Sequence, residues 1–417
     1  MMNEWLSHLL FRDEDPRSLP IIEGEENFLP RLLEEDIAPL VYYQLKKMRL
    51  LDTIPQEVKA SLEDFFLLNL ARNFRIRIDV SNLLKGFHAH HFPSILLKGL
   101  ALISHYYPHP ATRRMTDADI LIKKENLPAI DKYLASLGYR PIDSTVSQAI
   151  DNPSGYLASL EYHTEDERPI IHLHWHVINT SVPFFFPYPL EDLWQTAHSI
   201  NLEGVPALIP SPEHMCLHLA EHGLRVNHSY ARLILIYDLY ALIRCAGRNM
   251  NWGKILSLAD YSGLSPFLYF SFLHLEKWAG PIIPCTVKER VQPLTLSPLQ
   301  HLYVWFIEGD VRIRGLSYLL YLSLLSGVRG KSKFVFSTFF PPRRISRQRV
   351  RDHKRPAVKI YFSRLWEIAR LGGRVFLICL LRLMGGTQKV RTRLDRIKDR
   401  GRYFNKKGNP PRHTSIP

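Results

Sequence analysis

The sequence predicts an α+β protein in which a small mixed sheet lies between an N-terminal and a C-terminal helical region. Short apolar runs bounded by turn residues are confined to the segment between about residues 90 and 185, and such runs are typical of buried strands. The segments on either side carry apolar residues at three- and four-residue spacing, which is typical of helices. We therefore predict a helical region at 1–90, a mixed-sheet core at 91–185, a helical domain at 186–340 and a basic tail at 341–417.

The individual elements follow from these changes of pattern. Helices are expected at 30–51 and 55–90, where Pro55 suits a first helical position. In chain order, the core is expected to hold a strand at 92–97, a helix at 100–107, a strand at 119–122, a helix at 127–137 that ends at Gly138, and two strands at 156–162 and 169–178. From Ser211 to about residue 330 the pattern is helical again. Strands that alternate with helices indicate a compact mixed unit.

Composition excludes several classes of protein. The 417 residues are 46% hydrophobic and 23% charged, which is typical of a globular chain rather than a disordered one. The four cysteines lack the spacing of a disulfide framework or a zinc ribbon. The longest apolar stretches span about a dozen residues, whereas a membrane helix needs about 20, and the first residues lack the pattern of a signal peptide. We expect a cytoplasmic protein.

The basic charge of the chain belongs to its tail. Residues 341–417 carry 22 Lys and Arg against 4 Asp and Glu, a net charge of +18, whereas residues 1–340 carry 32 against 36, a net charge of −4. Such a block favours an anionic partner, either a nucleic acid or an anionic membrane surface to which the protein binds peripherally. Basic and apolar residues interleave at 391–407, as in a basic amphipathic helix. The alternative is a solvated extension without a specific partner.

One stretch of the core, Ile95 to Ile122, combines three features that suit phosphate chemistry. Gly99 follows a predicted buried strand and opens a helix, and a helix N-terminus attracts phosphate through its free N–H groups. Asp117 and Asp119 precede another strand at a spacing of two, so both carboxylates share one face. Two such carboxylates can bridge a pair of Mg²⁺ ions. Arg113 lies just upstream and suits the charge of a triphosphate.

These features and several short motifs resemble a known family. The motifs are L-K-G at 97–99, Y-P-x-P at 107–110, R-x-x-x-D-x-D-I-L at 113–121, L-G-Y at 137–139, L-H-W at 173–175, S-P-E at 211–213 and H-L-x-x-H at 218–222. From about residue 30 to about 330 the chain resembles the uncharacterised nucleotidyltransferase-like family of bacteria, and through it the DNA polymerase β superfamily. The resemblance implies Mg²⁺-dependent transfer of a nucleoside monophosphate from an NTP to an acceptor that it does not identify.

The resemblance also implies roles for individual residues. Asp117 and Asp119 would be catalytic and would hold the two Mg²⁺ ions, while Lys98, Gly99 and Arg113 would bind the triphosphate. Superfamily enzymes usually carry a third carboxylate before L-H-W, and here that residue is His172, which would be the third metal ligand. Glu161 on the preceding strand is the alternative acid. Without a third acid, the chain would be a binding or regulatory protein on a degenerate nucleotidyltransferase fold.

Two further histidine patterns compete with this interpretation. His172, His174 and His176 alternate along one predicted strand and would share a face, which is a transition-metal pattern but also fits a polar strand face that lines the cleft. His218 and His222 flank Glu221 in an H-x-x-E-H pattern, which occurs in inverted zinc proteases. We expect the polar face in the first case, and helix packing or contact with substrate in the second.

Overall fold

The computed structural model describes most of the chain before residue 341. The described residues are 2–12, 28–142, 146–150, 158–166, 168–178, 187–325 and 327–340, together with helical residues at 362, 365–366, 368–373 and 375–377. The chain divides into two compact units, Met1–Phe334 and Val335–Pro417. The basic segment 391–407 lies outside the described residues.

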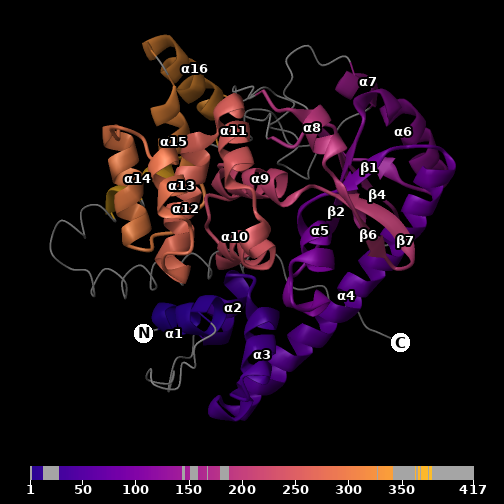
Figure 1. Cartoon of the computed structure of the whole chain (residues 1–417), viewed down its shortest axis with the longest axis horizontal. Helices are drawn as coiled ribbons and strands as arrows, with labels where there is room; N and C mark the ends of the chain where they lie inside the picture. Colours follow the sequence, from indigo (N-terminus) through magenta and orange to yellow (C-terminus); the bar gives the residue numbers. More distant parts are fainter. Residues whose placement is uncertain are drawn as a thin grey trace. The chain divides into compact units, whose positions relative to one another are not determined.

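A seven-stranded mixed sheet forms the centre of the first unit (Figure 1). Its strands are β1 (Ser94–Leu96), β2 (Asp117–Ile122), β3 (Arg140–Pro141), β4 (Ser159–His163), β5 (Ile170–His174), β6 (His198–Leu202) and β7 (Val205–Ile209), in the spatial order β3-β4-β5-β2-β1-β7-β6. The β2–β5 and β1–β7 pairs are parallel and the other pairs are antiparallel. The sheet with its flanking helices confirms the predicted α+β class.

The β6–β7 hairpin was not expected from the sequence. Its two turn residues, Glu203 and Gly204, both have positive φ, as in a type I′ turn. Through β7 the hairpin pairs with β1, so the sheet extends beyond residue 185 into the range assigned to the helical domain. A turn of the sequence Glu-Gly is a weaker signal than Asn-Gly, and Pro206 interrupts the second strand pattern.

Helices precede the sheet in the sequence, and the longest of them contacts it. They are α1 (Met2–Ser7), continued by a π-helical segment (His8–Arg12), α2 (Phe28–Glu34), α3 (Ala38–Lys47) and α4 (Gln56–Ala89). The 34-residue α4 follows Pro55, as predicted, and is about 50 Å long at 1.5 Å per residue. It contacts β2 and β7 (Figure 1). The short helices α5 (Lys98–His105), α6 (Leu127–Ser136) and α7 (Val146–Ile150) lie between strands of the sheet in the sequence.

The segment after β5 is mainly helical. Its helices are α8 (Leu190–Gln195), α9 (Pro212–Leu224), α10 (Leu233–Ala246), α11 (Trp252–Ser262), α12 (Ser265–Ala279), α13 (Cys285–Val291), α14 (Pro298–Glu308), α15 (Ser317–Leu324) and α16 (Gly327–Phe339). The almost fully buried α9 packs against α10, α11 and α12 (Figure 1). A buried ion pair between Glu35 and Arg312, with N–O distances of 2.6 and 2.7 Å, joins this bundle to the N-terminal helices.

The second unit begins within α16. Large apolar side chains are exposed among its described residues, including Phe336, Phe362, Trp366 and Phe376. Within the described parts of the chain, no helix has both the length and the apolar character that crossing a membrane requires.

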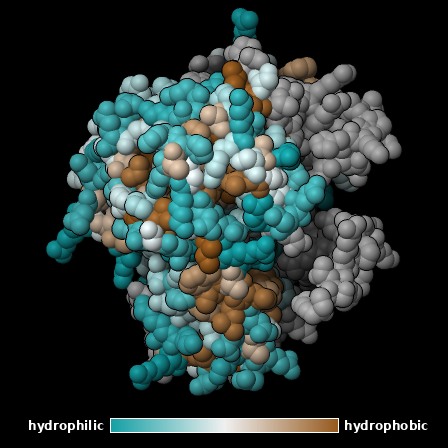
Figure 2. Space-filling model, turned by 90° about the vertical axis from the view of Figure 1, so that its right-hand side faces the viewer, coloured by the Kyte–Doolittle hydropathy of each residue, from teal (hydrophilic) through white to brown (hydrophobic). Residues whose placement is uncertain are grey.

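The face in Figure 2 is mostly hydrophilic, with hydrophobic side chains gathered in its lower half.

Candidate active site

The pairing of β2 with β5 sets the position of the site. Asp119 is the register partner of His172, and neighbours in a parallel pair share a face of the sheet. At a spacing of two, Asp117 joins this face on β2 and His174 joins it on β5. The antiparallel pairing of β4 places Glu161 opposite His172, also on this face. Alternation along three strands therefore gathers one polar face from residues far apart in the sequence.

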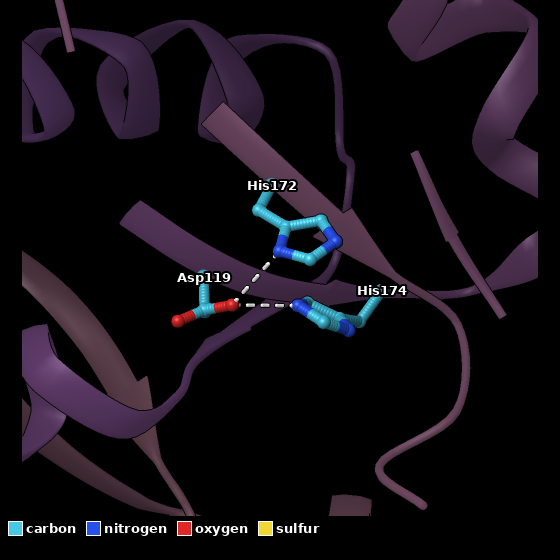
Figure 3. Close-up of side chains that lie close together, drawn as sticks. All are labelled: Asp119, His172 and His174. Atoms are coloured by element: carbon cyan, nitrogen blue, oxygen red, sulfur yellow. Dashed lines mark hydrogen bonds and ion pairs between the residues drawn. The ribbon is translucent and has the colours of Figure 1, made fainter. Parts of the chain in front are cut away.

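Asp119 lies at the centre of this face (Figure 3). Its Oδ1 atom is 2.7 Å from His174 Nε2 and 3.2 Å from His172 Nδ1. The same oxygen is 2.6 Å from the Lys98 ammonium, which reaches it from the start of α5. Asp119 and Lys98 are only 6% and 8% exposed. Three nitrogen atoms thus converge on a single buried carboxylate oxygen.

The environment keeps Asp119 ionised. Burial alone would raise its pKa, but the Lys98 ammonium and the hydrogen bonds from His172 and His174 outweigh burial and hold the pKa well below its ordinary value. The pKa of His174 is lowered in turn, mainly by burial and then by His172 and Lys98, so its imidazole is neutral. Burial and the nearby Asp119 raise the pKa of Asp117. The two aspartates therefore differ in basicity.

Of the three metal ligands predicted from the sequence, the structure brings together Asp119 and His172 but not Asp117. Among the described residues, Asp119, His172 and His174 form a group whose ligand atoms all lie within 4.8 Å of one another. Asp117 is not part of this group, although it shares the strand face, and it accepts a 3.3 Å hydrogen bond from Thr116 Oγ1. His174 was expected only as part of a polar face, yet it makes the shorter histidine contact with Asp119.

His176 lies beyond the end of the strand that carries His172 and His174. Strand β5 ends at His174. Beyond that point, the Nδ1 atom of His176 accepts a 3.2 Å hydrogen bond from the backbone N–H of Ile178, so the period-two alternation no longer applies.

The turn between β1 and α5 differs in detail from the expectation for a phosphate-binding glycine. The residue with left-handed backbone is Lys98, at φ 45°, and not Gly99. A Cβ atom added at Gly99 would lie 2.6 Å from Arg113 Nη1 and 3.2 Å from Met115 Cγ. The absent side chain of Gly99 therefore gives room to the Arg113 guanidinium.

Arg113 is held by a residue that the sequence analysis did not assign to the site. Its Nε and Nη2 atoms donate to the two carboxylate oxygens of Asp238 on α10, at 2.7 and 2.8 Å. The Tyr107 hydroxyl donates to the same carboxylate at 2.5 Å. The third nitrogen of Arg113, Nη1, donates a longer 3.4 Å hydrogen bond to the Arg114 carbonyl and lies beside Gly99. No local signal could reveal a pair separated by 125 residues.

Two asparagines of α4 hold the loop that carries Arg113. The Asn69 side-chain amide donates to the carbonyl of Ala111 at 2.5 Å. The Asn73 amide donates to the carbonyls of Pro110 and Arg113 at 2.6 and 2.7 Å. Both asparagines are almost fully buried. Polar residues on the buried face of a helix thereby fix the backbone next to the site.

A second group of histidines comes from α9 and the loop that follows it. His218 Nδ1 lies 2.8 Å from the carbonyl oxygen of Val177, just beyond β5. Burial lowers the pKa of His218 to about 3. The positive charges of Arg225 and Lys98 lower it further, whereas the negative charge of Asp119 acts in the opposite direction. The pKa of His222 is also lowered, first by its own burial and then by the nearby His228 and Lys98. These neutral rings therefore lie within electrostatic range of the Lys98–Asp119 pair.

Within the part of the chain that the structure describes, the H-x-x-E-H pattern on α9 does not form a protease-like centre. Glu221 accepts hydrogen bonds from Arg225 Nε and Nη2 at 2.9 and 2.7 Å, so its carboxylate is paired with a cation. Among the residues that the structure describes, His218 and His222 are not part of any group of three potential metal ligands. Two ring nitrogens, His218 Nε2 and His222 Nδ1, are buried and have no hydrogen-bond partner in the described parts of the chain.

Comparison with known proteins identifies the family of the chain. Residues 24–280 match the family model described as uncharacterised nucleotidyltransferase. The matched range contains the sheet, the Asp119 group, Arg113 with Asp238, and the α9 histidines. A search of curated proteins finds no match. The match covers more than half of the chain, and the chain therefore belongs to the uncharacterised nucleotidyltransferase family.

Proposed function

We propose that the protein transfers a nucleoside monophosphate from an NTP to an acceptor at the site around Asp119. Family membership supports nucleotidyl transfer in general. The observation that carries the proposal is the buried, ionised Asp119 carboxylate with the Lys98 ammonium 2.6 Å away, at the centre of a polar strand face. Preorganised charges in a site with little water stabilise developing charge more than they would in water.

The proposed reaction is an in-line displacement at phosphorus. An acceptor hydroxyl attacks the α-phosphorus, the bond from that phosphorus to the bridging oxygen breaks, and pyrophosphate leaves with the bonding electrons. We assign the hydroxyl proton to Asp117, because it shares the strand face with Asp119 but is not part of the Asp119–His172–His174 group. Lys98, Gly99 and Arg113 are the proposed nucleotide-binding residues, since Arg113 Nη1 lies beside Gly99 at the start of α5.

A pair of Mg²⁺ ions, as the resemblance implies, fits these residues poorly. Mg²⁺ prefers octahedral coordination by oxygen. Here the Asp119 carboxylate is already paired with Lys98, and a histidine occupies the position of the expected third acid. Glu161 shares the face but is exposed. We therefore assign no step of the reaction to a Mg²⁺ pair.

The α9 histidines provide a second surface for a substrate. A neutral imidazole can accept or donate a hydrogen bond without adding charge. The unpartnered nitrogens of His218 and His222 are buried, and a buried polar atom without a partner is costly. We propose that these atoms contact the acceptor or the nucleotide base.

A second candidate function has support of its own. The Lys98–Asp119 pair already neutralises the central carboxylate, and His172 replaces the third acid. Both features suit a protein that binds a nucleotide without transferring it. In this case the chain would be a regulatory or binding protein on a nucleotidyltransferase fold.

The experiment that separates the two functions measures pyrophosphate. The full chain is incubated with each of the four labelled NTPs and with Mg²⁺, Mn²⁺ or Zn²⁺, and both pyrophosphate release and NTP binding are recorded. Release that is lost in Asp119→Asn but retained in Asp64→Asn, an exposed residue on α4, supports transfer. NTP binding without release under any of these conditions supports the binding protein. The absence of both NTP binding and pyrophosphate release would contradict both proposed functions.

The tail has a separate proposed role. We propose that residues 341–417 bind a polyanion, either a nucleic acid or an anionic membrane surface, because they carry a net charge of +18. The exposed Trp366 and Phe376 would add apolar contact at a membrane surface.

A further inference from the structure

We infer that Asp119, His172 and His174 bind one divalent transition-metal ion of the Zn²⁺ and Co²⁺ class, in place of a Mg²⁺ pair. The inference rests on the proposed function only for its location, since this is the face on which we propose nucleotidyl transfer. It is carried by the geometry and chemistry of the three side chains (Figure 3).

The geometry suits a single ion. Each residue offers one ligand atom, and all three atoms lie within 4.8 Å of one another. Asp119 Oδ1 is 2.7 Å from His174 Nε2 and 3.2 Å from His172 Nδ1. Ligand atoms around a tetrahedral Zn²⁺ are about 3.4 Å apart, given bonds of about 2.1 Å. A small opening of the group would therefore suffice, because side chains on adjacent strands already aim at one point.

The donor set selects the class of metal. Two imidazoles and one carboxylate suit Zn²⁺, Co²⁺ and related ions, whereas Mg²⁺ prefers oxygen donors. The rings of His172 and His174 lie 4.0 Å apart, so both can face the same ion. On binding, the metal would replace the proton that His174 Nε2 shares with Asp119, and the ring proton would move to Nδ1. The fourth position would remain open for water or a phosphate oxygen.

Lys98 is the natural competitor of such an ion. Its ammonium is 2.6 Å from the same Asp119 oxygen and is 8% exposed. Two cations close to one carboxylate oxygen repel each other, so a bound metal must displace the ammonium. Removal of the ammonium should therefore strengthen metal binding at this site. A Zn²⁺ ion held at an unrelated surface histidine would not respond to Lys98.

The test titrates the metal-free full chain with Zn²⁺ and Mg²⁺ by calorimetry, and with Co²⁺ by visible absorption, without nucleotide. We expect one Zn²⁺ per chain in the calorimetric titration and one Co²⁺ per chain in the absorption titration. The visible absorption bands of Co²⁺ should be those of a low-coordinate site with nitrogen and oxygen ligands. Mg²⁺ should bind at least about 100-fold more weakly than Zn²⁺. His174→Ala and His172→Ala should each weaken Zn²⁺ at least about tenfold. Lys98→Met should tighten it about tenfold. His301→Ala, at an exposed histidine on α14, should change nothing.

Several outcomes would overturn the inference. Zn²⁺ binding that survives both His174→Ala and His172→Ala, or that disappears only in His218→Ala, would place the ion elsewhere. Equal affinity for Mg²⁺ and Zn²⁺ would also overturn it. Circular dichroism of each variant shows whether it is folded. If one of the two histidine variants does not fold, the other still tests the inference. The titration contains no nucleotide, so its result does not depend on nucleotidyl transfer. A Zn²⁺ site here, together with no pyrophosphate release in the separate NTP assay, would uphold this inference and contradict nucleotidyl transfer.

Discussion

Lys98 Nζ lies 2.6 Å from Asp119 Oδ1 in a buried ion pair that joins the start of α5 to the middle of β2. The pair brings a cation to one of the two aspartates that the sequence predicts as metal ligands. Lys98 reaches this position from a left-handed backbone conformation, which is uncommon for a residue with a side chain. An uncommon backbone conformation and a buried ion pair thus occur at the same residue.

Replacing Lys98 tests the contribution of this pair to stability. Lys98→Met should lower the free energy of unfolding by on the order of 3 kcal/mol, because a buried carboxylate loses its cation. The double variant Lys98→Met, Asp119→Asn should be less destabilised than the sum of the two single variants. Urea denaturation of the four proteins measures the coupling. Additive losses would show that the two residues do not stabilise each other.

The Arg113–Asp238 pair should matter in the same way. Asp238→Asn removes the charge that neutralises a buried guanidinium, and should cost on the order of 3 kcal/mol. The control is Asp260→Asn, which breaks an exposed pair with Arg290 and should cost less than about 1 kcal/mol. The comparison is made by urea denaturation. A loss at Asp238 no larger than that at Asp260 would exclude a structural role for the pair.

Exchange of the histidine at the third acidic position tests the metal preference of transfer. His172→Asp adds a carboxylate beside Asp119 and should shift the ratio of transfer rates with Mg²⁺ and Zn²⁺ about tenfold toward Mg²⁺, because Mg²⁺ prefers oxygen donors. Rates of pyrophosphate release with each metal give this ratio. Glu161→Gln in the parent is the companion variant, since Glu161 faces His172 from β4. If only Glu161→Gln changes the rate, Glu161 is the third acid.

Acid should destabilise the fold through buried neutral histidines. Burial lowers the pKa of His274 to about 3, and its Nε2 lies 3.2 Å from the Tyr303 hydroxyl. The unfolded chain binds a proton at this residue below about pH 6.5, whereas the folded chain does not until about pH 3, so stability falls as pH falls through this window. His274 should account for about 2 kcal/mol of the loss between pH 7 and pH 5.

Urea denaturation of His274→Gln at both pH values checks this prediction. The stability lost between pH 7 and pH 5 should be smaller in the variant than in the parent by about 2 kcal/mol. His301→Gln, at an exposed position, should show the same loss as the parent. An unchanged loss in His274→Gln would mean that another group controls the acid sensitivity.

Truncation after Phe340 tests the tail. The full chain should bind RNA, DNA or anionic liposomes more tightly at low salt than at high salt, because several Lys and Arg release counterions or neutralise lipid charge. The truncated chain should lose this binding and keep its NTP binding. Loss of liposome binding alone would select the membrane surface. The absence of binding by the full chain at low salt would refute a polyanion partner.

Local patterns predicted the sheet core and part of the site, because they depend on short-range alternation. The strand with Asp117 and Asp119 and the shared face of His172 and His174 follow from a period of two. The turn at 98–99 follows from a glycine placed directly after a short apolar run. The contacts that define the site do not follow from it. The pairing of Arg113 with Asp238 depends on packing between segments 125 residues apart.

Other details of the site that the sequence does not reveal have the same physical origin. The sequence predicts a phosphate site at Gly99, but it does not show that the Arg113 side chain, whose place is set by α10, lies beside that glycine. Alternation also cannot show where a strand ends, and β5 ends at His174, before His176. The ability of Lys98 to reach Asp119 depends on a left-handed backbone that no residue type in the sequence requires. Tertiary packing decides each of these cases.

The amide bonds from Asn69 and Asn73 have a practical consequence for protein engineering. They mean that the loop before β2 is shaped by a helix outside the segment 91–185, while Asp238 anchors the same loop from the other end of the family-matched region. A fragment cut to the sheet core would keep both aspartates and lose the groups that orient Arg113. The polar strand face around Asp119 therefore depends on elements outside the sheet core, and minimal expression fragments should retain α4 and α10 together with the strands between them.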